Sequence, residues 1–535
     1  MSRNFGMKGY MKGALLLTIA AIIVKILSAV YRVPFQNLVG DQGFYIYQQV
    51  YPFISFFVVW TSGGFAVAIS KMLADVEMGK NPLEQKYFVS QTIFSYLSVL
   101  SILFFLFLFL GADWLANLMD DQNLSMLIKT GSFVTLFMPI LALMKGIFQS
   151  RGEMAPVAYA QVFEQAIRVS IILIGTIIIM KTSESLYGAG NMAVLGTVLG
   201  EIAGVILLFF ILKKKVSLQK VPKNKYKRWP IIKEVTLLSI SVSLSSLLIL
   251  SLQLIDSFTI YSTMVDEGMG EYIAQIKKGI YDRGQPLVQL GIVIASSLSL
   301  AIVPLVAHHM KKQGGRSAIP FIQLTYRSSL LFGVAASIGL IVVMPYVNTM
   351  LFKTNDLSTV LMIIVLQIIP LSIILTLTAI LQGMGKLKMP AIFIFCALVV
   401  KGIGNLVLVP QFDVLGASIA SDLSLYLCAF LLIVYIKNLT SIHLAESRFY
   451  IKLFSASIAM VIAVFIIDKF LQFFTGVVRS TRIEAILFGS CLIGVGAFVF
   501  LTVVAKTRLI GEKEWFLLPF GRRMAVYQLW LNKRR

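Results

Sequence analysis

Nine ionisable side chains lie inside long apolar runs of this sequence, where a charge is costly. At the centre of a membrane-spanning helix a Lys, Arg or Asp costs about 2.5–3.5 kcal/mol even on the scale derived from insertion experiments. Each of these groups must therefore pair with another or face a water-filled cavity, where it can bind charged cargo or a coupling ion. Five are basic and four acidic: Lys25, Arg32, Lys145, Arg168 and Lys401, and Glu164, Glu201, Asp256 and Asp422.

The elements that must position them are membrane-spanning helices. The chain is 58% hydrophobic and 13% charged, with a mean hydropathy of +0.86, outside the range of soluble domains. Runs of about 20 apolar residues span the hydrocarbon core, and the first run is too long for a cleavable signal peptide. About fourteen spans are predicted: 13–34, 46–70, 88–110, 125–149, 156–180, 188–212, 231–260, 285–307, 328–352, 358–383, 389–409, 414–436, 449–471 and 483–505.

The basic residues predict the orientation of these spans. Of the 47 Lys and Arg, 31 fall in alternate loops that begin with the N-terminus and 7 in the opposite loops. Cytoplasmic loops retain positive charge, so we expect a multi-pass protein with both termini in the cytoplasm. The basic stretch 213–233 fits this topology and contact with anionic lipids, and we expect no nucleic-acid partner.

The chain also contains an internal repeat. Gly146-Ile147-Phe148-Gln149-Ser150-Arg151-Gly152 corresponds to Ala379-Ile380-Leu381-Gln382-Gly383-Met384-Gly385, with equivalent positions 233 residues apart. Duplicated membrane bundles hold their cargo at the seam between the halves. We predict an all-α polytopic fold with a six-helix bundle over 1–212, a basic cytoplasmic linker over 213–230, a second six-helix bundle over 231–438, two additional helices over 439–506 and a basic interfacial cytoplasmic tail over 507–535.

Nothing in the sequence predicts an enzyme. No Walker-type glycine-rich lysine motif, nucleophile elbow or paired catalytic carboxylates occur, so uphill transport would draw on an ion or substrate gradient, the membrane potential or a separate subunit. No metal site, cofactor or disulfide is expected, because the cysteines lie within spans and the histidines at their ends: Cys396, Cys428 and Cys491, and His308, His309 and His443.

Some of the nine charges have counterparts in both halves, which favours structural pairing. Arg168 and Glu201 correspond approximately to Lys401 and Asp422. Interhelical bridges from Arg168 to Glu201 and from Lys401 to Asp422 are as plausible as a role in binding. Glu164 is also placed to pair with Arg168 one turn further along the same helix.

The remaining charges indicate an anionic cargo. An electropositive first half suits phosphate, for which Arg supplies a forked donor and Lys a compact charge. Arg32 alternatively reaches the outer headgroups. Asp256 either holds a coupling cation or lies in the outer interface. The candidate cavity set is Lys25, Arg32, Lys145, Arg168, Glu164 and Lys401.

Several motifs resemble one bacterial family. Lys25-Ile26-Leu27-Ser28-Ala29-Val30-Tyr31-Arg32-Val33-Pro34-Phe35, Gly40-Asp41-Gln42-Gly43-Phe44-Tyr45-Ile46-Tyr47-Gln48 and Gln161-Val162-Phe163-Glu164-Gln165-Ala166-Ile167-Arg168-Val169 resemble the polysaccharide-transport and stage V sporulation protein B group. This group belongs to the multidrug/oligosaccharidyl-lipid/polysaccharide (MOP) exporter superfamily and is related to the MurJ-type lipid II flippases. The resemblance covers nearly the whole chain and implies a MATE/MurJ-like fold that works by alternating access.

The resemblance also implies roles for particular residues. Cations of the first span line the cavity in MurJ-like proteins, and Lys25 and Arg32 occupy comparable places. A sodium site in those relatives would correspond to Asp256, Asn405 and Ser418, but Val409 stands where a further acid is expected. Na⁺ or H⁺ remains the candidate coupling ion.

We therefore expect a flippase of the bacterial cytoplasmic membrane. Its substrate would be an undecaprenyl-pyrophosphate-linked saccharide, either lipid II or a polysaccharide unit, with membrane lipids and envelope-synthesis proteins as further partners. The alternatives are a cation-coupled multidrug exporter of the same fold and a scaffold that recruits envelope synthases without transport.

Overall fold

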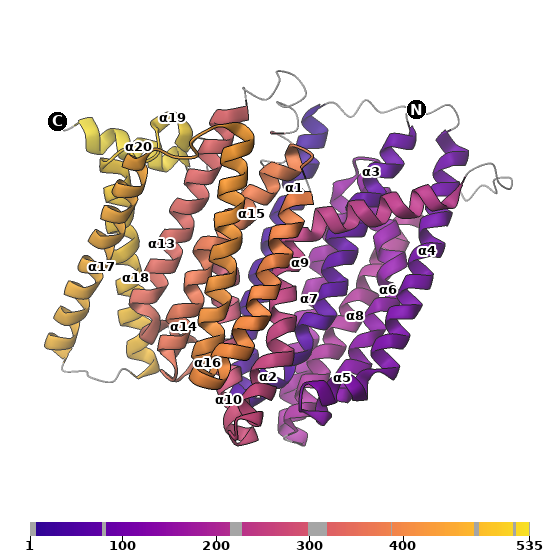
Figure 1. Ribbon diagram of the computed structural model, residues 1–535, viewed down its shortest axis with the longest axis horizontal. Helices are drawn as coiled ribbons and strands as arrows, with labels where there is room; N and C mark the ends of the chain where they lie inside the picture. The colour runs from indigo at the N-terminus through magenta and orange to yellow at the C-terminus, as the bar shows by residue number, and fades with distance from the viewer. Residues whose placement is uncertain are drawn as a thin grey trace. The chain divides into compact units, whose positions relative to one another are not determined.

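The computed structural model describes residues 7–77, 82–183, 185–213, 227–297, 306, 318–386, 388–475, 481–516 and 521–533. These residues form helices, and no strand occurs among them (Figure 1). Within these described residues, eleven helices are long and apolar enough to cross a membrane, and two of them, Ile19–Val76 and Lys388–Thr440, each cover two predicted spans. The all-α polytopic fold is confirmed, and about fourteen spans are consistent with it. The predicted span 285–307 and linker 213–230 lie partly outside the described residues.

The chain divides into two compact units. The first comprises Met1–Asp282 with Asn405–Asp413, and the second comprises Arg283–Gly404 with Val414–Arg535. The division falls after Asp282 and not in the basic linker. The segment 231–282, which the repeat assigns to the second bundle, therefore packs within the first unit.

The first unit is built around a group of closely packed helices. Helix α6 packs against α3, α4 and α8, α7 packs against α1 and α8, and α9 packs against α2 and η1. Apolar side chains including Ile69, Ile93 and Met138 form a buried core between α3, α4 and α6. The elements are α1 (Met7–Val30), α2 (Arg32–Val59), the π-helix η1 (Trp60–Phe65), α3 (Ala66–Glu77), α4 (Pro82–Leu110), α5 (Ala112–Leu118), η2 (Gln122–Leu124), α6 (Ser125–Ser150), α7 (Met154–Thr182), α8 (Leu186–Lys213), α9 (Arg228–Asp266) and α10 (Glu271–Asp282).

The chain stays helical from α1 into α2. Tyr31, between Val30 and Arg32, has a φ of −63° and a ψ of −24°, and its N–H donates to the carbonyl of Leu27 at 3.1 Å. Pro34 has no N–H to donate to the carbonyl of Val30. A break lies at Gly40, whose φ of 69° and ψ of −172° are not helical.

The second unit is centred on α13, which packs against α15, α17 and α18. The long helix α16 breaks at Asp413 (φ 52°, ψ −138°), three residues after Pro410, where the predicted spans 389–409 and 414–436 meet. The elements are α11 (Gly284–Gly291), α13 (Ile319–Phe352), α14 (Ser358–Ile364), η4 (Val365–Gln367), α15 (Ile368–Gly383), α16 (Lys388–Thr440), α17 (Ser447–Thr475), α18 (Arg482–Lys506), α19 (Glu512–Trp515) and α20 (Gly521–Lys533).

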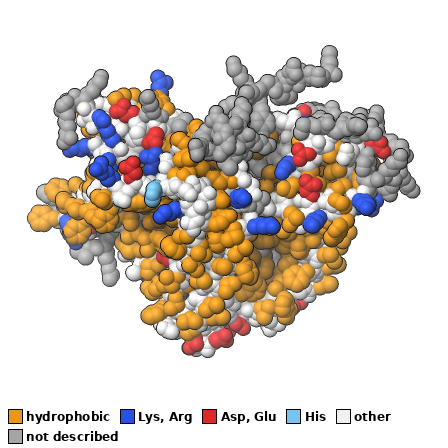
Figure 2. Space-filling view, turned by 45° about the horizontal axis from the view of Figure 1, so that its top comes forward, with side chains coloured by type: hydrophobic (Ala, Val, Ile, Leu, Met, Phe, Trp, Pro, Cys, Tyr) orange, Lys and Arg blue, Asp and Glu red, His pale blue; other side chains and the backbone are white. Residues whose placement is uncertain are grey.

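The surface shows the pattern of a membrane protein. Hydrophobic side chains cover most of the lower part of the face drawn in Figure 2, and Lys and Arg side chains gather above them. An apolar belt beside a basic rim is the distribution expected where a protein meets lipid tails and headgroups.

Candidate functional site

A buried ion pair joins α6 and α7 in the first unit. The Lys145 Nζ lies 2.9 Å from the Glu164 carboxylate and donates a hydrogen bond of 2.9 Å to the hydroxyl of Ser62. Lys145 has no exposed surface and Glu164 is 6% exposed. Gly204 on α8 makes room for the pair, because a Cβ there would overlap the Glu164 carboxylate. Glu164 thus pairs with Lys145 on the neighbouring helix and not with Arg168.

A second ion pair joins α7 and α8. Arg168 Nη2 donates to Glu201 Oε1 at 3.2 Å, and the Glu201 carboxylate is buried. This is the bridge that the sequence suggested for the first half. The two pairs together neutralise two cations with two carboxylates inside the membrane-spanning part of the unit.

Arg32 takes part in neither of these ion pairs. Its side chain has no exposed surface, and its guanidinium carbon lies 4.4 Å from the centre of the Tyr51 ring. The hydroxyls of Tyr31 and Tyr47 lie 2.8 Å apart beside it.

None of the three guanidinium nitrogens of Arg32 makes a hydrogen bond within the described residues. The phenols of Tyr31 and Tyr51 are close, but neither meets the distance and angle of a hydrogen bond to the guanidinium. In this conformation Arg32 therefore does not extend to the outer headgroups. It is a buried cation, and its guanidinium N–H groups have no hydrogen-bond acceptor within the described residues.

Lys25 lies on α1, two turns before Arg32. Its side chain is exposed, in contrast to the buried Lys145. Its place as a cavity cation stays a prediction.

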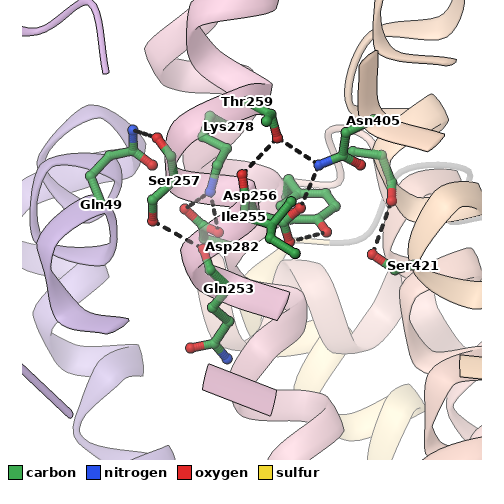
Figure 3. A network of polar contacts seen from close by, with 12 residues as sticks. Gln49, Gln253, Ile255, Asp256, Ser257, Thr259, Lys278, Asp282, Asn405 and Ser421 are labelled. Carbon is green, nitrogen blue, oxygen red and sulfur yellow. Dashed lines mark hydrogen bonds and ion pairs between the residues drawn. The ribbon is translucent and has the colours of Figure 1, made fainter. Parts of the chain in front are cut away.

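Asp256 lies at the centre of a polar network between α9, α10 and α16 of the first unit (Figure 3). Asn405 Nδ2 donates to Asp256 Oδ1 at 2.9 Å and to Thr259 Oγ1 at 2.7 Å. The Tyr281 hydroxyl donates to Asp256 Oδ2 at 2.9 Å. Asp256 is 3% exposed, so its carboxylate is buried within the first unit. The structure thus brings together Asp256 and Asn405.

The sequence reasoning missed an ion pair beside this network. Lys278 Nζ donates to both carboxylate oxygens of Asp282, one turn along α10, at 2.7 and 2.8 Å. Burial raises the pKa of Asp282 to about 6, and the Lys278 ammonium opposes this shift. Their i, i+4 spacing is visible in the sequence, but residues 261–284 lie between two predicted spans, outside the apolar runs in which a charge is costly. Figure 3 shows this pair next to Asp256.

In the second unit Lys401 contacts oxygens of the twelfth predicted span. Lys401 Nζ donates to the carbonyl oxygen of Ala417 at 3.0 Å and to the Ser421 hydroxyl at 2.5 Å. Asp422 Oδ1 has no hydrogen-bond donor among the described residues. The bridge from Lys401 to Asp422 stays a prediction.

Ser418, the third residue of the predicted cation set, makes a local contact. Its hydroxyl donates to the carbonyl of Val414 at 2.9 Å, as serines within helices commonly do. No group of three or more His, Cys, Asp or Glu suited to a metal ion occurs in the described part of the chain.

The apolar helices and their internally paired charges define a multi-pass membrane protein. The chain belongs to the family described as "Polysaccharide biosynthesis protein", which it matches over residues 10–310. It is 34% identical over 537 residues to "Uncharacterized membrane protein YabM" of Bacillus subtilis (strain 168), covering 98% of each chain. It is 25% identical over 436 residues to "Lipid II flippase MurJ" of the same organism, covering 77% of this chain and 80% of the relative.

The fold agrees with these relatives. A solved structure titled "Lipid II flippase MurJ, inward closed conformation" matches with a TM-score of 0.68 and 14% identity, covering 92% of this chain and 99% of that chain. The chain therefore belongs to this family of membrane proteins, and its fold is that of the MurJ and MATE structures.

Proposed function

We propose that this protein is a flippase for a cell-envelope saccharide linked to undecaprenyl pyrophosphate, either lipid II or a polysaccharide unit. It works in the bacterial cytoplasmic membrane by alternating access, with both termini in the cytoplasm. The observation that carries the proposal is Arg32, a fully buried cation that donates no hydrogen bond within the described residues.

The cost of that burial explains why an anion is the expected cargo. A buried charge without a partner costs several kcal/mol, so a group that pairs with it gains the corresponding stabilisation. The guanidinium fork matches two phosphate oxygens, and Arg168 lies near the same three tyrosines. A pyrophosphate fits this arrangement better than a neutral sugar or a cationic drug.

Substitution of Arg32 tests the proposal. Arg32→Gln removes the charge and should weaken binding of the pyrophosphate-linked sugar about ten- to a hundredfold, the value of a charge-assisted hydrogen-bonded contact. The affinity of Arg32→Lys for this lipid should lie between the affinities of the wild type and of Arg32→Gln, because lysine keeps the charge and lacks the forked guanidinium. Lys129→Gln, which removes a partly exposed cation on α6, is the matched control.

The measurement is competitive native mass spectrometry of the purified protein. The competitors are an undecaprenyl-pyrophosphate-linked sugar, undecaprenyl phosphate and a cationic drug. Selective retention of the sugar lipid, lost in Arg32→Gln and kept in Lys129→Gln, supports the flippase. Preferential retention of the drug would support the multidrug exporter, and unchanged binding in Arg32→Gln would remove Arg32 from the cargo site.

We further propose that Asp256 and Asn405 hold the coupling cation. The amide oxygen of Asn405 has no donor within the described residues, and a rotation of that amide would present the oxygen beside the Asp256 carboxylate. Asp256→Asn should abolish any stabilisation by sodium, measured as the thermal unfolding midpoint in sodium against choline chloride. An unchanged sodium effect in Asp256→Asn would remove this residue from the site.

A further inference from the structure

The C-terminal helix α20 presents a face that the second unit does not cover. Its inward stripe includes Ala525 and Gln528, which are 1% and 0% exposed. Val526, Leu529 and Trp530 are 61%, 42% and 53% exposed. With 100° of rotation per residue, the exposed stripe of Val526, Leu529 and Trp530 points about 130° away from the buried stripe of Ala525 and Gln528. The exposed cations Arg522 and Arg523 lie one turn earlier on the same outward side.

Contacts on the inward side hold this helix in a defined orientation. Trp515, which the sequence placed in an interfacial tail, is 1% exposed, and its Nε1 donates to Gln528 Oε1 at 2.6 Å. The hydroxyls of Tyr527 and Thr502 lie 2.9 Å apart. A Cβ on Gly521 would overlap the carbonyl oxygen of Trp515. The outward face of α20 is therefore fixed relative to the last turns of α18.

The contact with α18 also fixes the depth of α20. Helix α18 has 25 residues and is about 38 Å long, which exceeds the ~30 Å hydrocarbon core. Helix α20 packs near the last turns of α18, at Thr502 and Ala505. Figure 1 shows α19 and α20 at this end of α17 and α18. That level is where lipid headgroups lie.

The charge of the segment matches one kind of lipid surface. Residues 521–535 contain five Lys or Arg and no Asp or Glu, and Lys506 and Arg508 at the end of α18 are exposed as well. Aromatic and aliphatic side chains beside cations are typical of helices that lie in the interface of an anionic bilayer.

We infer that the outward face of α20 binds anionic lipid headgroups and thereby strengthens the packing of three membrane-spanning helices. Arg327 of α13 pairs with Glu514 of α19, and α19 packs on α20. Lys452 of α17 donates to the carbonyl of Thr507 at 2.8 Å, directly after α18. Binding of lipid to α20 thus stabilises α13, α17 and α18 together. This inference is independent of the cargo.

Amide hydrogen exchange tests the inference on the full-length protein in nanodiscs of phosphatidylglycerol or phosphatidylcholine. Each exposed Arg near an anionic surface contributes about 1 kcal/mol, so α20 amides should exchange up to about thirtyfold more slowly in phosphatidylglycerol. Arg522→Gln with Arg523→Gln should remove most of the difference. Arg522→Lys with Arg523→Lys should keep the difference between the two lipids, and so should Arg482→Gln at the opposite end of α18.

Two results would overturn the inference. One is equal exchange of wild-type α20 in both lipids, and the other is a full lipid effect in the Gln double variant. Gly521→Leu provides a separate readout, because it should undock α20 and speed its exchange in both lipids without any change of charge. Slow exchange in this variant would show that the contact with Trp515 does not hold the helix.

Discussion

Replacing Glu164 with Gln removes the carboxylate beside a lysine that has no exposed surface. Breaking a buried pair by removal of one partner costs about 3–5 kcal/mol, because the other charge stays buried and uncompensated. Lys145 keeps its hydrogen bond of 2.9 Å to Ser62, so we expect the lower end, about 3 kcal/mol. That is a large part of the 5–15 kcal/mol typical of a folded protein.

The assay is equilibrium unfolding in mixed detergent and sodium dodecyl sulfate, followed by circular dichroism. The double variant Lys145→Met with Glu164→Leu removes both charges and keeps a similar side-chain volume. Its free energy of unfolding should be closer to that of the wild type than the free energy of unfolding of Glu164→Gln is. Lys129→Gln, at a partly exposed pair, should shift the transition much less. A Glu164→Gln transition no different from that of Lys129→Gln would refute the reasoning.

Two further predictions concern other buried contacts of the membrane bundle. Gly204→Ala should destabilise the protein by about 1–3 kcal/mol through overlap with Glu164, whereas Gly402→Ala, with no atom within 4 Å of the new Cβ, should be tolerated in the same unfolding assay. Because burial raises the pKa of Asp282 to about 6, above the usual ~4, the folded state takes up a proton first, and stability should rise as the pH falls from about 6 to 4. Asp282→Asn should remove this pH dependence, and a retained dependence would contradict the assignment.

The sequence alone determined the membrane-spanning character of the chain, its all-α class and the residues that carry charge into the spans. These properties depend on local composition, because about 20 consecutive apolar residues specify a span wherever they occur. The repeat made a bridge from Arg168 to Glu201 one of two readings of these charges, and the structure shows the bridge.

The tertiary structure alone decided which charge meets which partner. Glu164 pairs with Lys145 because Gly204 leaves space on the adjacent helix. Lys401 donates a hydrogen bond to the Ser421 hydroxyl. Such choices depend on the rotation and the spacing of helices, which no pattern along one helix encodes.

The structure likewise decided the two features that carry the proposals. Arg32 is buried, and the ring of Tyr51 covers its guanidinium. The outward face of α20 is defined because Trp515 turns inward onto Gln528. In both cases the sequence supplied the residue types, and packing between elements decided whether each side chain faces protein, lipid or ligand.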